Sequence, residues 1–142
     1  MGFVIDRSTE LGAKVEARLE EQRLAWLTTV ASDRTPQPNP VWYLWDGDSI
    51  IIFSKPGQAK LSNIKRHPQV SLNLEATGDE EQVTIFTGTA EVIDRASIGP
   101  DVLDRYATRY KQGMVGIGMT REQYEAAYSE VIRFTPTKLR GW

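Results

Sequence analysis

A short stretch of the chain, residues 53–66, combines the residue types that hold a phosphate group. A strand end, a Pro-Gly turn and a helix start follow one another there, and a helix N-terminus offers unpaired N–H groups and a positive dipole. Ser54 adds a hydroxyl donor, and Lys60 adds a charge in the first helical turn. The stretch has no acidic residue but four cations, in a chain of net charge -2: Lys55, Lys60, Lys65 and Arg66. We interpret it as a phosphate site. A solvated basic helix is the alternative, which the local pattern alone favours.

A second informative stretch, residues 36–45, alternates three prolines with polar residues and ends in aromatic ones. Pro36, Pro38 and Pro40 keep the backbone extended and remove N–H donors, which is typical of a sheet edge or the rim of a cleft. Trp42 and Tyr43 beside such a rim could pack on a flat ring. The alternative is that they fill a barrel core or a dimer interface, which is the commoner fate of such residues.

Residues for acid–base or nucleophilic chemistry are poorly placed. The carboxylate groups at 46–48 and 79–81 fall in predicted turns, where solvated charge is the simpler explanation. His67 precedes a proline at a helix end and is interpreted as a cap. With this single histidine and no cysteine, we assign neither catalytic residues nor a metal site. A cofactor must therefore carry the reaction if the chain is an enzyme.

Composition limits the class of protein. The chain has 142 residues, 40% of them hydrophobic, which fits one domain over residues 1–142. The near-zero net charge and the short, locally compensated basic stretch argue against nucleic-acid binding. No run of about 20 apolar residues and no signal-peptide pattern is present, so we expect a cytoplasmic protein without a membrane partner.

Short strands and a few helices must position these residues. Apolar periodicity and turn residues predict helices over 9–23 and 58–66, a helix from Pro100, and one from Thr120 that a capping box with Gln123 opens. They predict strands over 24–31, 41–45, 49–54, 70–74, 83–93 and 131–134, with a bulge or bend at Gly88. We expect residues 78–81 to form an acidic loop, residues 113–118 a flexible glycine-rich loop and residues 139–142 a tail. Four tyrosines at helical spacing are interpreted as packing residues: Tyr106, Tyr110, Tyr124 and Tyr128.

The order of these elements indicates a mainly β, α+β fold. Six or so antiparallel strands with peripheral helices suggest a β-barrel. Strict alternation of strands and helices is missing, which argues against a parallel dinucleotide-binding sheet.

Four segments, residues 27–31, 38–48, 52–54 and 60–72, resemble the pyridoxamine 5'-phosphate oxidase-like family. The pattern Lys-x-x-Asn-Ile-x-x-x-Pro-x-Val from Lys60, directly after a Phe-Ser strand end, carries much of the likeness. The resemblance is strongest to the small branch that uses the deazaflavin coenzyme F420. It implies a split β-barrel of the FMN-binding type that forms a homodimer, with two cofactors in grooves at the subunit interface.

The resemblance also implies a set of cofactor-binding residues. The strand over 38–43 would run along the ring and its side chain: Pro38, Asn39, Pro40, Val41, Trp42 and Tyr43. The strand end and helix start would hold the phosphate: Phe53, Ser54, Lys55 and Lys60. Gln82 falls where flavin-using members place a glutamine that reaches the partner's ring, and Trp142 is expected to return to the groove.

Departures from the family pattern shape the functional hypothesis. The pyridoxamine phosphate enzyme holds its flavin phosphate with arginines at the positions of Pro38 and Ala59, and no histidine follows His67 here. These losses argue against vitamin B6 oxidation. We expect an F420-dependent reductase that passes a hydride to a small molecule with an electrophilic double bond, such as an enone or a tetrapyrrole bridge. The alternatives are an FMN-dependent enzyme of the same fold, a non-catalytic cofactor or tetrapyrrole carrier, and a structural dimer.

Overall fold

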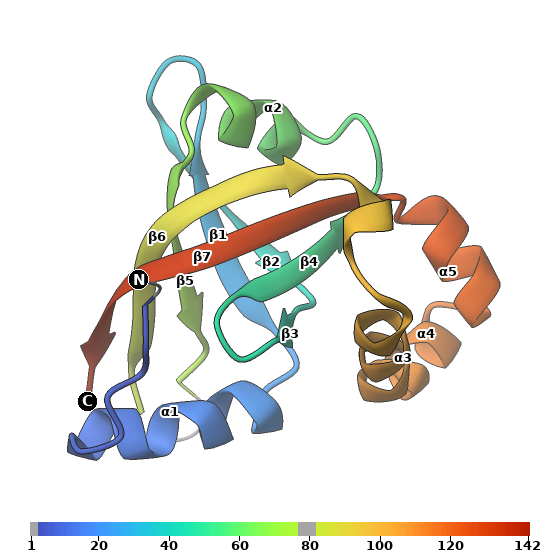
Figure 1. Cartoon of the computed structure of the whole chain (residues 1–142). Coiled ribbons are helices and arrows are strands. Elements are labelled where there is room, and N and C mark those ends of the chain that lie inside the picture. The colour runs from blue at the N-terminus through green and yellow to red at the C-terminus, as the bar shows by residue number, and fades with distance from the viewer. Residues whose placement is uncertain (1–2, 77–81) are drawn as a thin grey trace.

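The computed structural model describes residues 3–76 and 82–142, whose centre is one curled antiparallel sheet (Figure 1). Its seven strands lie in the order β2-β1-β5-β6-β7-β4-β3. Their bounds are β1 Ala25–Val30, β2 Pro36–Val41, β3 Leu44–Trp45, β4 Ile50–Ser54, β5 Gln69–Leu74, β6 Thr84–Ile93 and β7 Glu130–Gly141. The two edge strands, β2 and β3, are consecutive in the chain. The sheet therefore curls into an open barrel joined there by residues 42–43.

The curl depends on the two longest strands, β6 and β7, which pair from Thr84↔Gly141 to Ile93↔Val131. The register shifts between Thr87 and Gly88, which confirms the predicted bulge. A Cβ at Gly88 would lie 2.1 Å from the carbonyl oxygen of Thr135, so only glycine allows this close approach. The prediction of an irregular tail over 139–142 was wrong, because β7 extends to Gly141.

The strand predicted over 41–45 is also wrong, because the chain changes direction at Trp42 and Tyr43 between β2 and β3. The Tyr43 N–H donates to the Tyr110 hydroxyl at 2.8 Å rather than to a neighbouring strand. The proline-rich segment itself is β2, an edge strand, as its prolines predicted. In a strand, the backbone N–H groups of alternate residues point toward the same edge, so the three donors that the prolines lack would all lie along one edge of β2. The intervening residues can therefore pair with β1.

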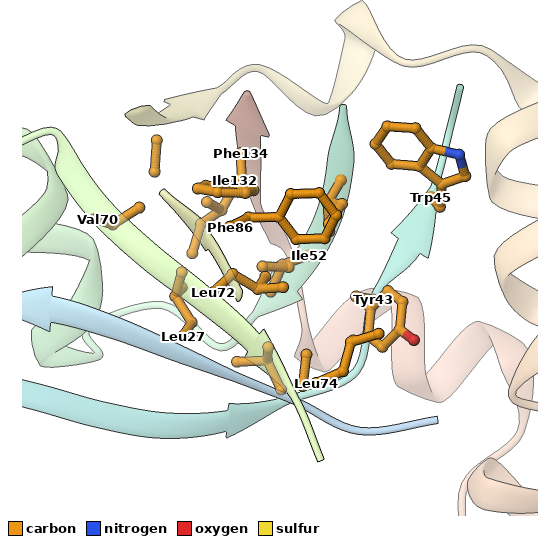
Figure 2. Packing of buried hydrophobic residues seen from close by; sticks show 14 of the residues in the cluster. Leu27, Tyr43, Trp45, Ile52, Val70, Leu72, Leu74, Phe86, Ile132 and Phe134 are labelled. Carbon is orange, nitrogen blue, oxygen red and sulfur yellow. The ribbon is translucent and has the colours of Figure 1, made fainter. Parts of the chain in front are cut away.

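The barrel core lies between the curled faces of the sheet. Burial alternates along β1, as expected for a strand with one face inward. Leu72, Phe86 and Phe134 are fully buried and lie together in Figure 2. Every residue of β4 is buried, because one face of β4 meets the barrel core and the other meets a second apolar cluster.

Two helices lie at opposite ends of the barrel (Figure 1). Helix α1, Glu10–Glu21, begins at Thr9, whose hydroxyl accepts the Gly12 N–H at 2.9 Å. It buries Val15 and Leu19 against the core, as the apolar spacing predicted. Helix α2, Ala59–Arg66, buries Leu61 and Ile64 and ends at the cap residue His67.

The remaining helices form a lobe beside β4: the 3-10 turn η1 Arg95–Ser97, α3 Pro100–Arg109, α4 Lys111–Gly116 and α5 Arg121–Ala127. Thr120 and Gln123 form the predicted capping box of α5. The flexible loop predicted over 113–118 was wrong, because residues up to Gly116 are helical and Met114 is buried. A Cβ at Gly113 would lie 2.9 Å from the Trp42 ring, so this glycine serves close packing. The acidic loop predicted at 78–81 lies outside the described residues.

Candidate functional site

A polar pocket of about 420 Å³ lies between α2, β2 and the turn after β1, and we call it the α2 pocket. Its wall is rich in hydroxyl and amide groups, from Ser32, Gln37, Asn39, Gln58, Ser62 and Asn63. Such groups can donate to anionic oxygens from several directions. The size and the polar wall suit the phosphate-bearing part of a small-molecule ligand rather than an apolar ring.

The charges of the α2 pocket are of one sign. Among the residues that the structure describes, Lys60 and Arg66 are its two charged lining residues and no carboxylate lines it. Lys60 is half-buried, and this burial lowers the pKa of its ammonium group because it removes water from the charge. A bound anion would compensate for that lost solvation, so these two cations suit a negatively charged ligand.

The backbone at the start of α2 adds to this preference. The Gln58 side chain does not cap the helix, and the first turn holds no acidic residue. Helix N-termini of this kind bind anions through their N–H groups and dipole. The buried amide of Asn63 donates to the Thr29 hydroxyl at 3.1 Å, which ties α2 to β1 and fixes its orientation.

Two of the predicted cofactor residues line this pocket, Asn39 from β2 and Lys60 from α2. Pro38 and Pro40 are exposed on β2 and alternate with the two pocket-lining residues Gln37 and Asn39. The backbone of β2 therefore lies at the rim of the pocket, where the proline spacing predicted an edge.

The aromatic residues predicted beside the ring point elsewhere. Val41 and Tyr43 belong to the barrel core, and the Tyr43 hydroxyl donates to the Leu19 carbonyl at 2.7 Å. Burial raises the pKa of Tyr43 far above its ordinary value. Trp42 stacks on Tyr110 with ring centroids 4.7 Å apart and an interplanar angle of 4°. Their side chains therefore take the packing role that was the alternative interpretation, and any contact with a cofactor would come from the backbone.

The predicted phosphate-binding residues at the end of β4 also make contacts within the protein. Phe53 is buried against Tyr106, with ring centroids 4.6 Å apart. The buried Ser54 hydroxyl donates to the Lys55 carbonyl at 2.9 Å. The Lys55 ammonium lies 5.5 Å from the centroid of the Tyr128 ring. None of these three residues lines the α2 pocket.

Gln82 lies near the other end of the barrel. It lines a groove of about 890 Å³ together with α1, Gly141 and Trp142, which we call the α1 groove. Figure 1 places α1 and the C-terminal end of β7 at the end of the barrel opposite α2. The structure thus separates Gln82 from Asn39 and Lys60 within one chain, and brings Gln82 together with Trp142.

Sequence reasoning assigned only Asn39 and Lys60 of the residues that line the α2 pocket. It missed the other eight: Ala31, Ser32, Gln37, Gln58, Ala59, Ser62, Asn63 and Arg66. Asn63 and Arg66 follow Lys60 at intervals of three, which places all three on one helical face. Gln37 precedes Asn39 by two and shares its side of the strand. These spacings were visible in the sequence and could have identified Gln37, Asn63 and Arg66.

The described residues offer neither a metal site nor a membrane-spanning helix. Within 3–76 and 82–142, no cluster of three or more acidic or histidine side chains is placed to hold a metal ion. No helix in that part of the chain combines the length and apolar character needed to cross a bilayer.

The curled antiparallel sheet with its peripheral helices makes this a split β-barrel protein of the α+β class. The family model described as pyridoxamine 5'-phosphate oxidase matches residues 11–142, and the chain belongs to that family. No curated protein matches the sequence in a direct comparison.

Solved structures with the same fold differ in what they are described to do. A candidate pyridoxamine 5'-phosphate oxidase from Listeria innocua is 20% identical, with a TM-score of 0.70 over 93% of this chain and 98% of its own. An F420 reductase is 23% identical, with a TM-score of 0.69 over 88% and 94%. The heme storage protein HutZ from Vibrio cholerae is 16% identical, with a TM-score of 0.70 over 94% and 95%. At these identities the likeness establishes the fold alone.

Proposed function

We propose that the chain is an F420-dependent oxidoreductase, built as one cofactor-binding domain. The α2 pocket carries this proposal, because the half-buried Lys60 in the first turn of α2 and the exposed Arg66 in its last turn both line it, and none of its described lining residues is a carboxylate. F420 carries a phosphate, for which this charge pattern is suited. The positions of Pro38 and Ala59 lack the arginines expected of the FMN-binding oxidase, which favours the deazaflavin over FMN. The fold likeness to an F420 reductase supports the same choice.

We further propose that two copies of the chain build each cofactor site. The α2 pocket and Gln82 lie near opposite ends of the barrel (Figure 1). A cofactor that used both would lie between subunits, with its phosphate on one copy and its ring beside Gln82 of the other. A homodimer provides that arrangement because its interface is self-complementary.

The residues of the chain would bind and orient rather than react. Lys60, Arg66 and the first N–H groups of α2 would hold the phosphate, and the backbone of β2 with Asn39 would lie along the rest of the cofactor. When bound, F420 supplies hydride transfer to an electrophilic double bond, such as an enone or a tetrapyrrole bridge. Solvent would deliver the substrate proton, because none of the described residues is a buried carboxylic acid.

A carrier that binds a tetrapyrrole without turning it over is the second candidate, favoured by the fold likeness to a heme storage protein. An FMN-dependent enzyme is the third. Titration of the purified protein with F420, FMN and hemin, each in a separate experiment, distinguishes these candidates. We expect tight binding of F420 and weak binding of the other two. Preference for FMN or for hemin would replace the proposal with the corresponding alternative.

The affinity for F420 is expected to fall at alkaline pH. Burial already lowers the pKa of Lys60, so its ammonium loses a proton at lower pH than an exposed lysine would. A neutral amine no longer attracts the phosphate, and the dissociation constant rises as the pH passes the lowered pKa. Titrations between about pH 7 and pH 10 measure this change.

A Lys60→Arg variant is the control for this pH dependence, since its guanidinium stays charged over the whole range. The fall in affinity should be absent or displaced to higher pH in the variant. An equal fall in both proteins would show that another group is responsible.

A further inference from the structure

Strand β1 carries a buried hydroxyl group on the side that faces the barrel core. Burial alternates along β1, so Ala25, Leu27 and Thr29 share the inward side of the strand. Ala25 and Leu27 belong to the core cluster, and all three residues are fully buried. Valine has nearly the shape of threonine without the hydroxyl, so packing alone does not require a polar group at Thr29.

Helix α2 supplies the partner of this hydroxyl. Its inward side buries Leu61 and Ile64, and Asn63 is buried with them, with 6% of its surface exposed. The Asn63 amide donates to the Thr29 hydroxyl at 3.1 Å. Two polar side chains therefore meet in a layer where β1 and α2 otherwise pack through apolar ones.

The stability of the fold does not account for this pair. Replacing two hydrogen-bonded buried groups with apolar groups of similar shape is often neutral for stability. Asn63 also lines the α2 pocket, whereas Thr29 does not. The amide has two N–H donors, of which the bond to Thr29 uses one, so Asn63 has a second to offer to a ligand.

We propose that Asn63 is an anion-binding residue of the α2 pocket and that Thr29 is its positioning residue. Asn63 donates its second amide N–H to an oxygen of the ligand's phosphate, and the bond to Thr29 holds the amide in that orientation. The amide is a neutral donor, so it adds to the attraction of the Lys60 charge. The inference rests on the proposed function only for the identity of the ligand as F420, because its chemistry concerns any small molecule with a phosphate group.

Titration with F420 and with the phosphate-free 8-hydroxy-5-deazaflavin tests the role of Thr29. Thr29→Val should weaken F420 binding about tenfold and change the affinity for the phosphate-free compound less than about twofold. Thr29→Ser keeps the hydroxyl and should bind both compounds like the unaltered protein. Thr89→Val makes the same replacement at an exposed position of β6 and is the matched control. Equal weakening of both compounds by Thr29→Val would overturn the proposal.

The Thr29→Val, Asn63→Leu double variant tests whether the pair merely supports the helix. It replaces both polar groups with apolar ones of similar size, so its urea unfolding midpoint should stay close to that of the unaltered protein. Its F420 affinity should nonetheless remain about tenfold weakened, because the N–H donor is gone. Thr29→Val should have no further effect once Asn63 is leucine, since Thr29 acts through Asn63. Recovery of full affinity in the double variant would overturn the proposal.

The pH dependence of binding separates Asn63 from Lys60. The Lys60 ammonium loses its charge as the pH rises, whereas an amide does not titrate. The factor by which Thr29→Val weakens F420 binding should therefore be the same at about pH 7 and about pH 10. A factor that shrinks as Lys60 becomes neutral would mean that Thr29 acts through Lys60, and would overturn the assignment of Asn63.

FMN and riboflavin, which differ only in the phosphate, distinguish failure of this inference from failure of the proposed function. If the unaltered protein binds FMN rather than F420, the proposed function is overturned, and selective weakening of FMN by Thr29→Val supports the inference. Tight F420 binding that Thr29→Val leaves unchanged would overturn the inference alone. Binding of neither F420 nor FMN would overturn both.

Discussion

The Lys60→Ala variant is expected to bind F420 about 10- to 100-fold more weakly than the unaltered protein. Lys60 is a half-buried cation in a pocket without carboxylates, at the first turn of α2. A charge-assisted hydrogen bond to phosphate contributes about 1.5–3 kcal/mol, which corresponds to that range of affinity. Fluorescence or calorimetric titration of both proteins at neutral pH measures the difference.

Lys65→Ala is the matched control, because it removes the same charge from the same helix. Lys65 is exposed and does not line the α2 pocket. Its loss should change the affinity less than about threefold, as expected for a solvated charge. If the two variants weaken binding equally, the effect is general electrostatic attraction and the α2 pocket is not the phosphate site.

Replacement of Arg109 by alanine is expected to lower the free energy of unfolding by about 3 kcal/mol. The guanidinium of this α3 residue donates to the carbonyls of Tyr43, Glu20 and Leu19 at 2.9, 2.9 and 3.0 Å, and also to that of Gln22. It lies 4.7 Å from the centroid of the Tyr43 ring. One side chain thus joins the helical lobe, the end of α1 and the break between β2 and β3.

Urea unfolding followed by circular dichroism measures this loss, with Arg105→Ala as the control on the same helix. Arg105 is 42% exposed and pairs with the carboxylates of Asp46 and Asp101. Such surface pairs contribute about 0–1 kcal/mol, so the control should remain close to the unaltered protein. A loss below about 1 kcal/mol for Arg109→Ala would mean that water replaces its bonds without cost.

Local patterns predicted much of the fold. The apolar spacing of Val15 and Leu19, the Thr120 capping box and the bulge at Gly88 each depend on neighbours in the chain, and each is present. The turn at Gly47 also formed, with a φ of 86° that glycine adopts without strain. Local signals were misleading where a distant partner decided the conformation. The sequence around Gly113 predicted a loop, but this glycine lies in a helix and packs against the Trp42 ring.

The features of the candidate site also divide into those recognisable from the sequence and those that only the tertiary structure decided. The basic character of α2, the extended proline-rich edge and the family likeness could all be recognised from the order of residues. Only the tertiary structure decided which side chains share a pocket. It placed Asn39 beside Lys60, turned Tyr43 into the core and set Gln82 near the opposite end of the barrel. The physical reason is that helix starts, turns and strand edges arise from interactions a few residues apart, whereas a pocket forms only where the sheet curls and brings distant segments into contact.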